Sequence, residues 1–318
     1  MRKVLVTGCA GFIGSHVLER LHNAYPAHEF VGFDSLQYCA SKRNMETLYG
    51  ARFTFIEGNL RDSSALVKLF QAHAIDVVLH FAAESHVDNS FGNSIEFTLT
   101  NVLGTHNLLE AARQAPHRVS RFIHVSTDEV YGSQETIQCE TAMLTPTNPY
   151  AASKAAAEQL VRAYHISYGL PIIITRSNNV YGPRQYTEKL IPKFIGLLQR
   201  AEPLTIHGSG QQKRSFLYVD DVARAFEIIF ARGAIGEVYN IGTQEECTVL
   251  EVIEALELEM RVAAAKQHVT DRPFNDQRYF IDSSKLGALG WAPSVSFQEG
   301  LARTVQWYAD RDERYWLD

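Results

Sequence analysis

A tyrosine and a lysine four residues apart could together remove a proton from an alcohol. Tyr150 and Lys154 begin a helical pattern in the segment 150–154, which reads YAASK. Residues at positions i and i+4 share one face of a helix, so the ammonium group would lie beside the phenol. A neighbouring positive charge favours the phenolate, which makes Tyr150 a candidate base near neutral pH.

A second group of reactive side chains precedes this pair. Ser126 and Thr127 end a strand-like run, and Asp128 and Glu129 follow directly. Ligands bind open α/β sheets at the carboxyl ends of their strands, where Thr127 could hydrogen-bond a substrate hydroxyl. Two adjacent carboxyl groups repel each other, so we expect one pKa to rise and leave an acid beside a base. Such a pair suits elimination of water: a carboxylate takes a C–H proton while an acid protonates the departing hydroxyl.

Glycines near the start of the chain indicate a dinucleotide site. Residues 7–14 read TGCAGFIG and join a strand-like run to a helical segment, where glycine lets the backbone approach a pyrophosphate. Asp34 ends the next strand-like run, about 20 residues past the last glycine, where a carboxylate can bind a ribose 2′-hydroxyl. A carboxylate there would repel a 2′-phosphate. The sequence therefore favours NAD over NADP, and an oxidised nicotinamide would add positive charge beside Tyr150.

Strand-like and helical segments alternate along the chain, and they must position these residues. Short β-branched runs occupy 3–7, 29–34, 52–57, 76–81, 121–127 and 171–176, and helical patterns occupy 12–23, 63–72, 95–115 and 150–168. This alternation predicts a parallel sheet with helices on both faces, and continuously apolar strands are typical of such sheets. After Arg176 the pattern becomes less regular, with a helical stretch at 219–230 and a strand-like run at 237–242.

Composition limits the classes of partner. The 318 residues suggest two domains or one large one, and 46% of them are apolar. A net charge of −6 gives no electrostatic attraction to nucleic acid or to an anionic membrane, and no apolar stretch approaches the length of a membrane span. We therefore expect neither nucleic acid nor a membrane as a partner.

Four cysteines without a CxxC motif predict no disulfide framework and no metal site. With no leader pattern visible at Met1, we expect a cytoplasmic protein.

Taken together, the motifs resemble an extended short-chain dehydrogenase/reductase. The resemblance rests on residues 7–14, Asp34, HFAA at 80–83, Asn101, Ser126-Thr127, YxxxK and NVYGP at 179–183. Longer motifs are similar to nucleotide-glucose 4,6-dehydratases: AAESHVD at 82–88, TDEVYG at 127–132, NPYAASK at 148–154 and the stretch 178–194. The Asp-Glu pair is the discriminating feature. Sugar-nucleotide 4-epimerases usually carry a small or apolar residue there, and UDP-glucuronate decarboxylases keep the Glu but not the Asp.

The resemblance implies a closed redox cycle on bound NAD. Tyr150, aided by Lys154 and Thr127, would take the proton of the glucose 4-hydroxyl while C4 passes hydride to NAD⁺. Glu129 would then take the C5 proton, Asp128 would protonate the C6 hydroxyl, and water would leave. Return of the hydride to C6 would give the nucleotide-4-keto-6-deoxyglucose, a precursor of rhamnose and other deoxysugars.

The resemblance also implies two sets of binding residues. The cofactor set is Gly8, Gly11, Phe12, Ile13, Gly14, Asp34, Asn59, Leu60, Phe81, Ala82, Ala83, Ser85, Thr100, Ser126, Tyr150 and Lys154. The substrate set is Ser85, His86, Thr127, Asn179, Glu188, Lys189, Leu190, Arg214, Asn240, Arg272 and Asn275. Asn59 stands where many relatives place Asp, and Asn275 stands where bacterial dTDP-glucose enzymes often have His. The nucleobase, thymine or uracil, is therefore left open.

The expected architecture is α/β: a doubly wound parallel sheet of the Rossmann type that binds NAD, with a smaller C-terminal α/β substrate domain. We assign residues 1–177 and 211–242 to the first domain, and 178–210 and 243–318 to the second. The resemblance suggests a homodimer formed as a four-helix bundle by the helices near 95–115 and 150–168. Two alternatives remain: a UDP-sugar 4-epimerase or UDP-glucuronate decarboxylase using the same Tyr-Lys pair, and a non-catalytic NAD sensor.

Overall fold

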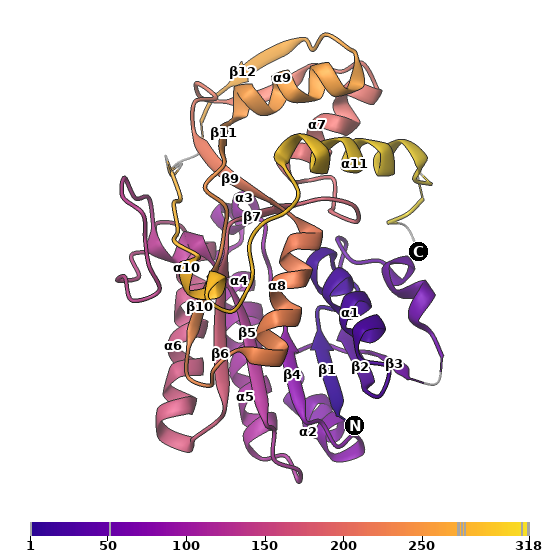
Figure 1. The fold of residues 1–318 in the computed structure, drawn as a ribbon, viewed down its shortest axis with the longest axis vertical. Coiled ribbons are helices and arrows are strands. Elements are labelled where there is room, and N and C mark those ends of the chain that lie inside the picture. Colours follow the sequence, from indigo (N-terminus) through magenta and orange to yellow (C-terminus); the bar gives the residue numbers. More distant parts are fainter. Residues whose placement is uncertain are drawn as a thin grey trace.

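A seven-stranded parallel sheet forms the larger lobe of the molecule (Figure 1). The structure, a computed structural model, describes residues 2–50, 52–271, 274, 276, 278–312 and 314–316. The strand order is β10-β6-β5-β4-β1-β2-β3, and every pairing within the sheet is parallel. The order runs outward from β1 in both directions, which is the doubly wound arrangement. The predicted fold class is thus confirmed.

The strands of this sheet agree with the sequence pattern to within one or two residues. They are β1 (Lys3–Thr7), β2 (Glu29–Asp34), β3 (Phe53–Glu57), β4 (Val77–His80), β5 (Arg121–Thr127), β6 (Ile172–Ser177) and β10 (Val238–Ile241). Most of their residues are buried because helices cover both faces of the sheet.

Two groups of helices cover the sheet. One apolar cluster joins it to α1 (Phe12–Ala24), α8 (Val219–Arg232) and α10 (Ser284–Gly287). A second cluster joins the other face to α2 (Ser63–Ala72), α5 (Thr105–Arg113) and α6 (Pro149–Tyr168). These two layers are the physical reason why the strands read as continuous apolar runs.

The predicted helix over 95–115 is confirmed as a helical segment but contains an irregular stretch. It comprises α4 (Ser94–Phe97), the π-helix η2 (Thr98–Gly104) and α5. π-helical turns are rare and frequently lie at functional sites. Here the wider turn carries Thr100 and Asn101, which contact the cavity wall described below.

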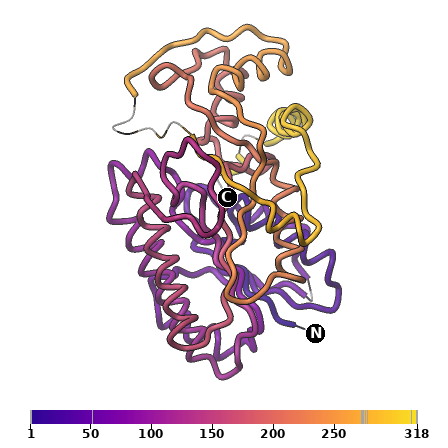
Figure 2. The backbone as a smooth tube through the Cα atoms, turned by 60° about the vertical axis from the view of Figure 1, so that its left-hand side comes forward, coloured from indigo at the N-terminus to yellow at the C-terminus, as the bar shows by residue number. Residues whose placement is uncertain are grey.

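A smaller lobe lies above the carboxyl end of the sheet (Figures 1 and 2). It has a three-stranded sheet, β11-β9-β7, and a parallel pair, β12-β8. Its strands are β7 (Asn179–Tyr181), β8 (Leu204–His207), β9 (Lys213–Tyr218), β11 (Glu246–Thr248) and β12 (Lys266–Val269), and its main helices are α7 (Leu190–Gln199), α9 (Val249–Met260) and α11 (Phe297–Asp310). A third apolar cluster joins these elements.

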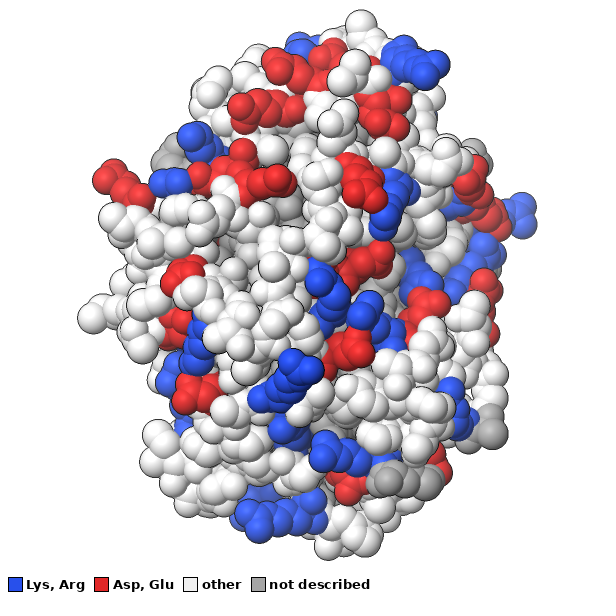
Figure 3. Space-filling model, in the orientation of Figure 1, with Lys and Arg blue, Asp and Glu red and all other residues white. Residues whose placement is uncertain are grey.

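Short helices connect the larger elements. They are η1 (Lys42–Leu48), α3 (Val87–Gly92) and η3 (Asp128–Tyr131). On the face shown in Figure 3, acidic and basic side chains are interspersed. Within the described ranges, no helix has both the length and the apolar character needed to cross a membrane. The same residues include no cluster of three His, Cys, Asp or Glu side chains arranged to hold a metal ion.

Candidate active site

One cavity of about 400 Å³ brings most of the predicted site residues together. It lies at the carboxyl ends of β1, β2, β4, β5 and β6 and reaches into the smaller lobe. All sixteen residues predicted to bind the cofactor line it. Among the predicted substrate residues, the cavity is lined by Ser85, His86, Thr127, Asn179, Glu188, Lys189, Leu190 and Arg214. Arg272 and Asn275 lie outside the described residues.

The glycine-rich loop between β1 and α1 forms one end of the cavity. Gly8 has φ of +71°, and a Cβ there would stand 2.6 Å from the backbone nitrogen of Ala82. A Cβ on Gly14 would overlap the carbonyl oxygen of Gly8. Helix α1 has no side-chain cap at Gly11, so its first backbone N–H groups face the cavity wall without that partner. This is the geometry that receives a pyrophosphate at a helix N-terminus.

Asp34 is held at the end of β2 by two backbone amides. Its Oδ2 accepts from Ala10 N at 2.9 Å, and its Oδ1 accepts from Leu36 N at 2.9 Å. Burial raises the pKa of Asp34, while these amide hydrogen bonds oppose the rise. Each carboxylate oxygen keeps further acceptor capacity for a ribose hydroxyl. Ser126 Oγ is buried at the same cavity and has no hydrogen-bond partner among the residues that the structure describes. The loop, Asp34 and this orphaned hydroxyl fit a dinucleotide with a free 2′-hydroxyl.

Tyr150 and Lys154 lie one turn apart on α6, at the middle of the cavity. Lys154 Nζ donates to the carbonyl oxygen of Val125 at 2.6 Å, and burial lowers the pKa of Lys154 to about 8. Burial and the carboxyls of Glu129 and Asp128 raise the pKa of Tyr150, whereas a hydrogen bond with Thr127 lowers it. The protein alone therefore keeps Tyr150 protonated, and formation of the phenolate requires additional positive charge in the cavity.

Asp128 lies behind the cavity wall rather than in it. Its side chain is almost fully buried, and it accepts hydrogen bonds from Asn178 Nδ2 at 2.7 Å and from Thr127 Oγ1 at 3.2 Å. Burial raises the pKa of Asp128 to about 7, and the charge of Glu129 contributes less than burial does. The prediction of a raised carboxyl pKa is consistent with this, but its main cause is desolvation rather than repulsion between neighbours.

Glu129 faces the cavity and is half-buried. Its backbone N–H donates to Thr127 Oγ1 at 3.3 Å, which caps η3 and fixes the direction of the acidic pair. Asn148 Nδ2 donates to Glu129 Oε2 at 3.1 Å. Burial raises the pKa of Glu129, and the amide of Asn148 limits the rise by stabilising the ionised form. The two carboxyl groups therefore occupy different environments.

Sequence reasoning missed several residues of the site. Asn148 caps α6 by accepting from Ala151 N at 2.8 Å while it donates to Glu129, and its signal was the Asn-Pro pair before the tyrosine. Asn178 holds Asp128 and also accepts from Thr243 N at 3.0 Å. Tyr279 and Asp276 also line the cavity; they lie close in the chain to Arg272 and Asn275, which the resemblance placed in the substrate set, but neither was itself predicted.

Asn101 ties the cavity wall to α6. Its Oδ1 accepts from Glu84 N at 2.8 Å, and its Nδ2 donates to the Glu84 carbonyl at 3.0 Å and to Ser153 Oγ at 2.9 Å. The π-helical turn aims this side chain at the segment 82–85. The segment therefore has a fixed position relative to Tyr150.

The smaller lobe closes the other end of the cavity. Glu188 Oε2 accepts from Tyr38 Oη at 2.8 Å, and Lys189 Nζ donates to the Ser85 carbonyl at 2.6 Å. The Arg214 guanidinium lies 4.8 Å from the ring centre of Tyr279. These contacts cross between the two lobes and place cationic groups at the cavity.

The prediction that Asn240 contacts the substrate disagrees with the structure. Asn240 is fully buried in β10 and does not line the cavity. Its Oδ1 accepts from Tyr131 Oη at 2.9 Å, and its Nδ2 donates to the carbonyls of Gln138 and Asp282. Both functions of its amide are thus used in packing β10 against neighbouring segments.

Comparison with known proteins identifies the family of this arrangement. A family model described as GDP-mannose 4,6 dehydratase matches residues 5–304. The human dTDP-D-glucose 4,6-dehydratase is 48% identical over 97% of this chain and 90% of its own length. A dTDP-glucose 4,6-dehydratase from Streptomyces venezuelae, solved with NAD and TYD bound, superposes with a TM-score of 0.94 at 42% identity, covering 99% of this chain and 98% of that one.

A plant relative is longer. The trifunctional UDP-glucose 4,6-dehydratase/UDP-4-keto-6-deoxy-D-glucose 3,5-epimerase/UDP-4-keto-L-rhamnose-reductase of Arabidopsis thaliana is 48% identical over the whole of this chain. The chain spans 48% of the length of that protein. The similarity therefore covers about half of the plant protein.

Proposed function

Because the chain belongs to the GDP-mannose 4,6 dehydratase family, we propose that it dehydrates a nucleotide-glucose, either dTDP-glucose or UDP-glucose, with NAD as its cofactor. The product is the nucleotide-4-keto-6-deoxyglucose. The observation that carries this proposal is the contrast between Asp128 and Glu129 beside Tyr150: one buried carboxyl with a pKa of about 7, and one that faces the cavity and is held by an amide.

Tyr150 takes the proton of the sugar 4-hydroxyl. When bound, NAD supplies an electron-pair acceptor for C4 that returns the pair at C6, and its oxidised ring brings positive charge to the cavity. That charge, together with Lys154, opposes the burial that raises the pKa of Tyr150. Thr127 hydrogen-bonds Tyr150 and orients its hydroxyl.

Elimination follows because the 4-keto group makes the C5 proton acidic. Glu129 faces the cavity, and its ionised form, which Asn148 stabilises by donating to Oε2, takes this proton. Asp128 is protonated below a pH of about 7 and supplies the proton that the departing C6 hydroxyl needs. Water leaves, and the proton held by Glu129 returns to C5. Glu129 thus ends in its starting state, and the cycle closes when the proton that Tyr150 took from the 4-hydroxyl replaces the one that Asp128 gave to water; Thr127 lies beside both groups.

Mass analysis of the product tests this proposal. Purified protein incubated with dTDP-glucose or UDP-glucose should yield a product lighter by one water. A product of unchanged mass would favour the 4-epimerase alternative, and loss of carbon dioxide from UDP-glucuronate would favour the decarboxylase. Bound NAD with no conversion of any of these sugars would support the non-catalytic sensor. Parallel rates with the two nucleotides would assign the nucleobase.

The same proposal includes a homodimer. Exposed apolar side chains lie on η2, α4 and α6: Ile95, Leu103, Ile166 and Tyr168 are 69%, 42%, 82% and 58% exposed. Exposed apolar side chains on neighbouring helices become buried when two copies of a chain pack as a four-helix bundle. Light scattering should give twice the chain mass, and Ile166→Glu should shift the protein towards the mass of one chain.

We also place the protein in the cytoplasm. All four of its cysteines are free thiols: Cys9, Cys39, Cys139 and Cys247. A reducing compartment preserves free thiols. Fractionation of cells that express the chain should recover it with cytoplasmic markers.

A further inference from the structure

The carboxylate of Glu129 has a second side-chain neighbour besides Asn148. Tyr279 Oη lies 3.4 Å from Glu129 Oε2, and its side chain is 5% exposed. Tyr279 follows Glu129 by 150 residues in the chain. Its neighbours are bound to the segment between η3 and α6: Gln134 N donates to the Arg278 carbonyl at 3.2 Å, and Gln138 N donates to the Phe280 carbonyl at 2.8 Å.

The hydroxyl of Tyr279 stands between two carboxyl groups. It lies 2.5 Å from Asp276 Oδ2, much closer than to Glu129. A phenol has one proton to donate, and the shorter contact identifies Asp276 as its acceptor. Burial and the charge of Glu129 raise the pKa of Tyr279, so this proton stays on the phenol. The Tyr279 oxygen therefore presents a lone pair to Glu129. Because two acceptors then face each other, the distance from Tyr279 Oη to Glu129 Oε2 is the longer of the two.

Asp276 connects this pair to the surface. Its side chain is 3% exposed, and Thr147 Oγ1 lies 2.8 Å from each of its oxygens, to either of which it can donate its one proton. Thr147 is an exposed residue immediately before Asn148. A continuous series of oxygen atoms therefore runs from the cavity to solvent through Glu129, Tyr279, Asp276 and Thr147.

We propose that Tyr279 and Asp276 form a proton relay that lets the proton taken by Glu129 exchange with solvent. This inference rests on the proposed dehydration. Glu129 gives its carboxyl proton to the Tyr279 oxygen as Tyr279 gives its own proton to Asp276, and Asp276 releases a proton to water beside Thr147. The reverse sequence returns a solvent proton to Glu129 and then to C5. One proton replaces another, and no net charge moves.

The orientation of the Tyr279 hydroxyl also predicts the direction in which removing it changes the pKa of Glu129. If Tyr279 accepts from the protonated form of Glu129, its removal destabilises that form and lowers the pKa of Glu129. If Tyr279 instead served only as a donor to the ionised form, its removal would raise that pKa. The direction in which the acidic limb of the pH–rate profile moves therefore separates a relay from a simple supporting contact.

Turnover in deuterium oxide tests the relay. The unaltered protein should place deuterium at C5 of the product. Tyr279→Phe should keep mostly protium at C5, lower turnover by about tenfold or more, and move the acidic limb to lower pH. Its reduction of bound cofactor on addition of substrate should stay within about twofold of the unaltered rate, because Tyr150 performs that step. Asp276→Asn should likewise keep protium at C5 and lower turnover. It provides a second test of the relay if Tyr279→Phe does not fold.

A matched control removes a buried hydroxyl elsewhere. Tyr239→Phe deletes a hydroxyl that accepts from Ala234 N at 3.0 Å outside the cavity, and it should incorporate deuterium like the unaltered protein. Full deuterium at C5 in both Tyr279→Phe and Asp276→Asn, or an acidic limb moved to higher pH, would overturn the relay. Failure of the unaltered protein to release any dehydrated product would instead overturn the proposed function.

Discussion

At the residue scale, the environments of Asp128 and Glu129 separate an acid from a base. Simple adjacency would treat the two carboxyls alike, yet Asp128 is almost fully buried and bonded to Asn178 and Thr127, whereas Glu129 faces the cavity and is bonded to Asn148. Burial penalises the charged form and keeps the first group protonated near neutral pH. This difference permits an elimination in which Glu129 takes a proton in the cavity and Asp128 supplies one from directly behind the cavity wall.

Replacing the proposed base should separate oxidation from elimination. Glu129→Gln keeps the size of the side chain but cannot take the C5 proton. Addition of substrate should still reduce the bound cofactor, seen as absorbance of the reduced nicotinamide, while release of dehydrated product falls by about 100- to 10,000-fold. Dehydration at the unaltered rate would assign the C5 proton to another residue.

Replacing the proposed acid should increase stability while it reduces activity. The folded-state pKa of Asp128 is raised to about 7, so folding binds a proton, and the ionised carboxyl costs stability increasingly as pH rises from about 4 to 7. Asp128→Asn removes this cost, worth up to about 4 kcal/mol above pH 7. Thermal unfolding at pH 8 should show a higher midpoint for the variant, and the gain should disappear near pH 4. An equal midpoint at pH 8 would contradict the buried, protonated acid.

Asp128 also determines the alkaline side of catalysis. Its acid form is lost as pH rises through about 7, so the elimination rate should fall there in the unaltered protein. Measuring dehydration between pH 5 and 9 checks this, since a rate that keeps rising beyond pH 8 would exclude Asp128 as the proton donor.

At the element scale, the start of α6 combines two functions. Asn148 accepts from Ala151 N to cap the helix and donates to Glu129, while Pro149 and Tyr150 begin the helix itself. The capping residue therefore sets the distance between the base on η3 and the tyrosine on α6.

A capping substitution should reveal both functions. Asn148→Ala should reduce the free energy of unfolding by about 0.5–2 kcal/mol and also raise the pKa of Glu129, because the ionised carboxylate loses a donor. A control is Thr248→Ala, which removes the capping box of α9 in the smaller lobe. Denaturant unfolding should show a comparable loss in both variants, and only Asn148→Ala should move the acidic limb of activity to higher pH. If Asn148→Ala and Thr248→Ala had the same pH profile of activity, Asn148 would not control the pKa of Glu129.

The sequence pattern predicted most of the elements because their causes are local. Two-sided burial produces apolar runs for β1, β4 and β5, and the predicted bounds of these strands lie close to the observed ones. The glycine loop, Asp34 and YxxxK could likewise be located because each motif lies on one or two consecutive elements.

Contacts between distant segments could not be predicted in the same way. Tyr279 and Asp276 come to Glu129 from about 150 residues further along the chain, and no periodicity near residue 276 indicates this. Asn240 was placed in the substrate set by resemblance, but it does not line the cavity and Tyr131 from η3 binds its amide instead. The π-helical turn at Thr98–Gly104 also has no sequence signature in the amphipathic pattern.

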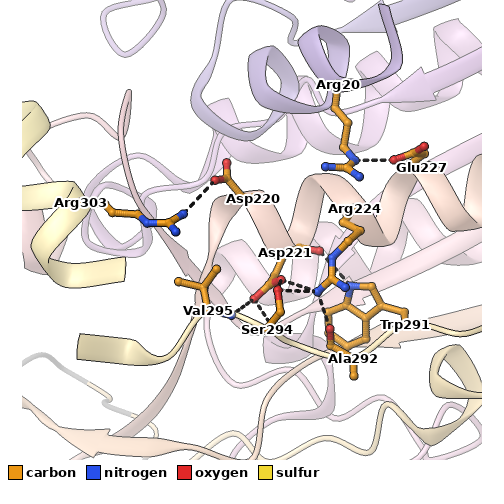
Figure 4. A network of polar contacts seen from close by, with 10 residues as sticks. All are labelled: Arg20, Asp220, Asp221, Arg224, Glu227, Trp291, Ala292, Ser294, Val295 and Arg303. Atoms are coloured by element: carbon orange, nitrogen blue, oxygen red, sulfur yellow. Dashed lines mark hydrogen bonds and ion pairs between the residues drawn. The ribbon is translucent and has the colours of Figure 1, made fainter. Parts of the chain in front are cut away.

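At the scale of the whole molecule, a polar network joins the two lobes (Figure 4). Asp221 on α8 is 1% exposed and accepts from the backbone N–H groups of Ser294 and Val295 and from Arg224. Trp291 Nε1 donates to the Asp221 carbonyl at 2.9 Å. These bonds attach the segment before α11 to a helix of the large sheet, so α8 supports both lobes.

Loss of this buried carboxylate should destabilise the protein broadly. Asp221→Ala should reduce the free energy of unfolding by about 2–4 kcal/mol, because the N–H groups of Ser294 and Val295 lose their acceptor, whereas Arg224 still donates to the Ala292 carbonyl. Glu227→Gln is the control: Glu227 pairs with Arg20 where both side chains are partly exposed, and its loss should cost less than about 1 kcal/mol. Hydrogen bonds lower the pKa of Asp221, so its contribution should fade only at strongly acidic pH. Similar unfolding curves for both variants would contradict this role of the network.

The central claim is that oxidation of the sugar, elimination of water and return of the same electron pair all take place in one cavity. Following a deuterium placed at C4 of the nucleotide-glucose tests it most directly. We predict that each product molecule carries this deuterium at C6, and that mixing labelled with unlabelled substrate yields no crossover at C6. Deuterium lost to solvent, or exchanged between substrate molecules, would contradict the claim.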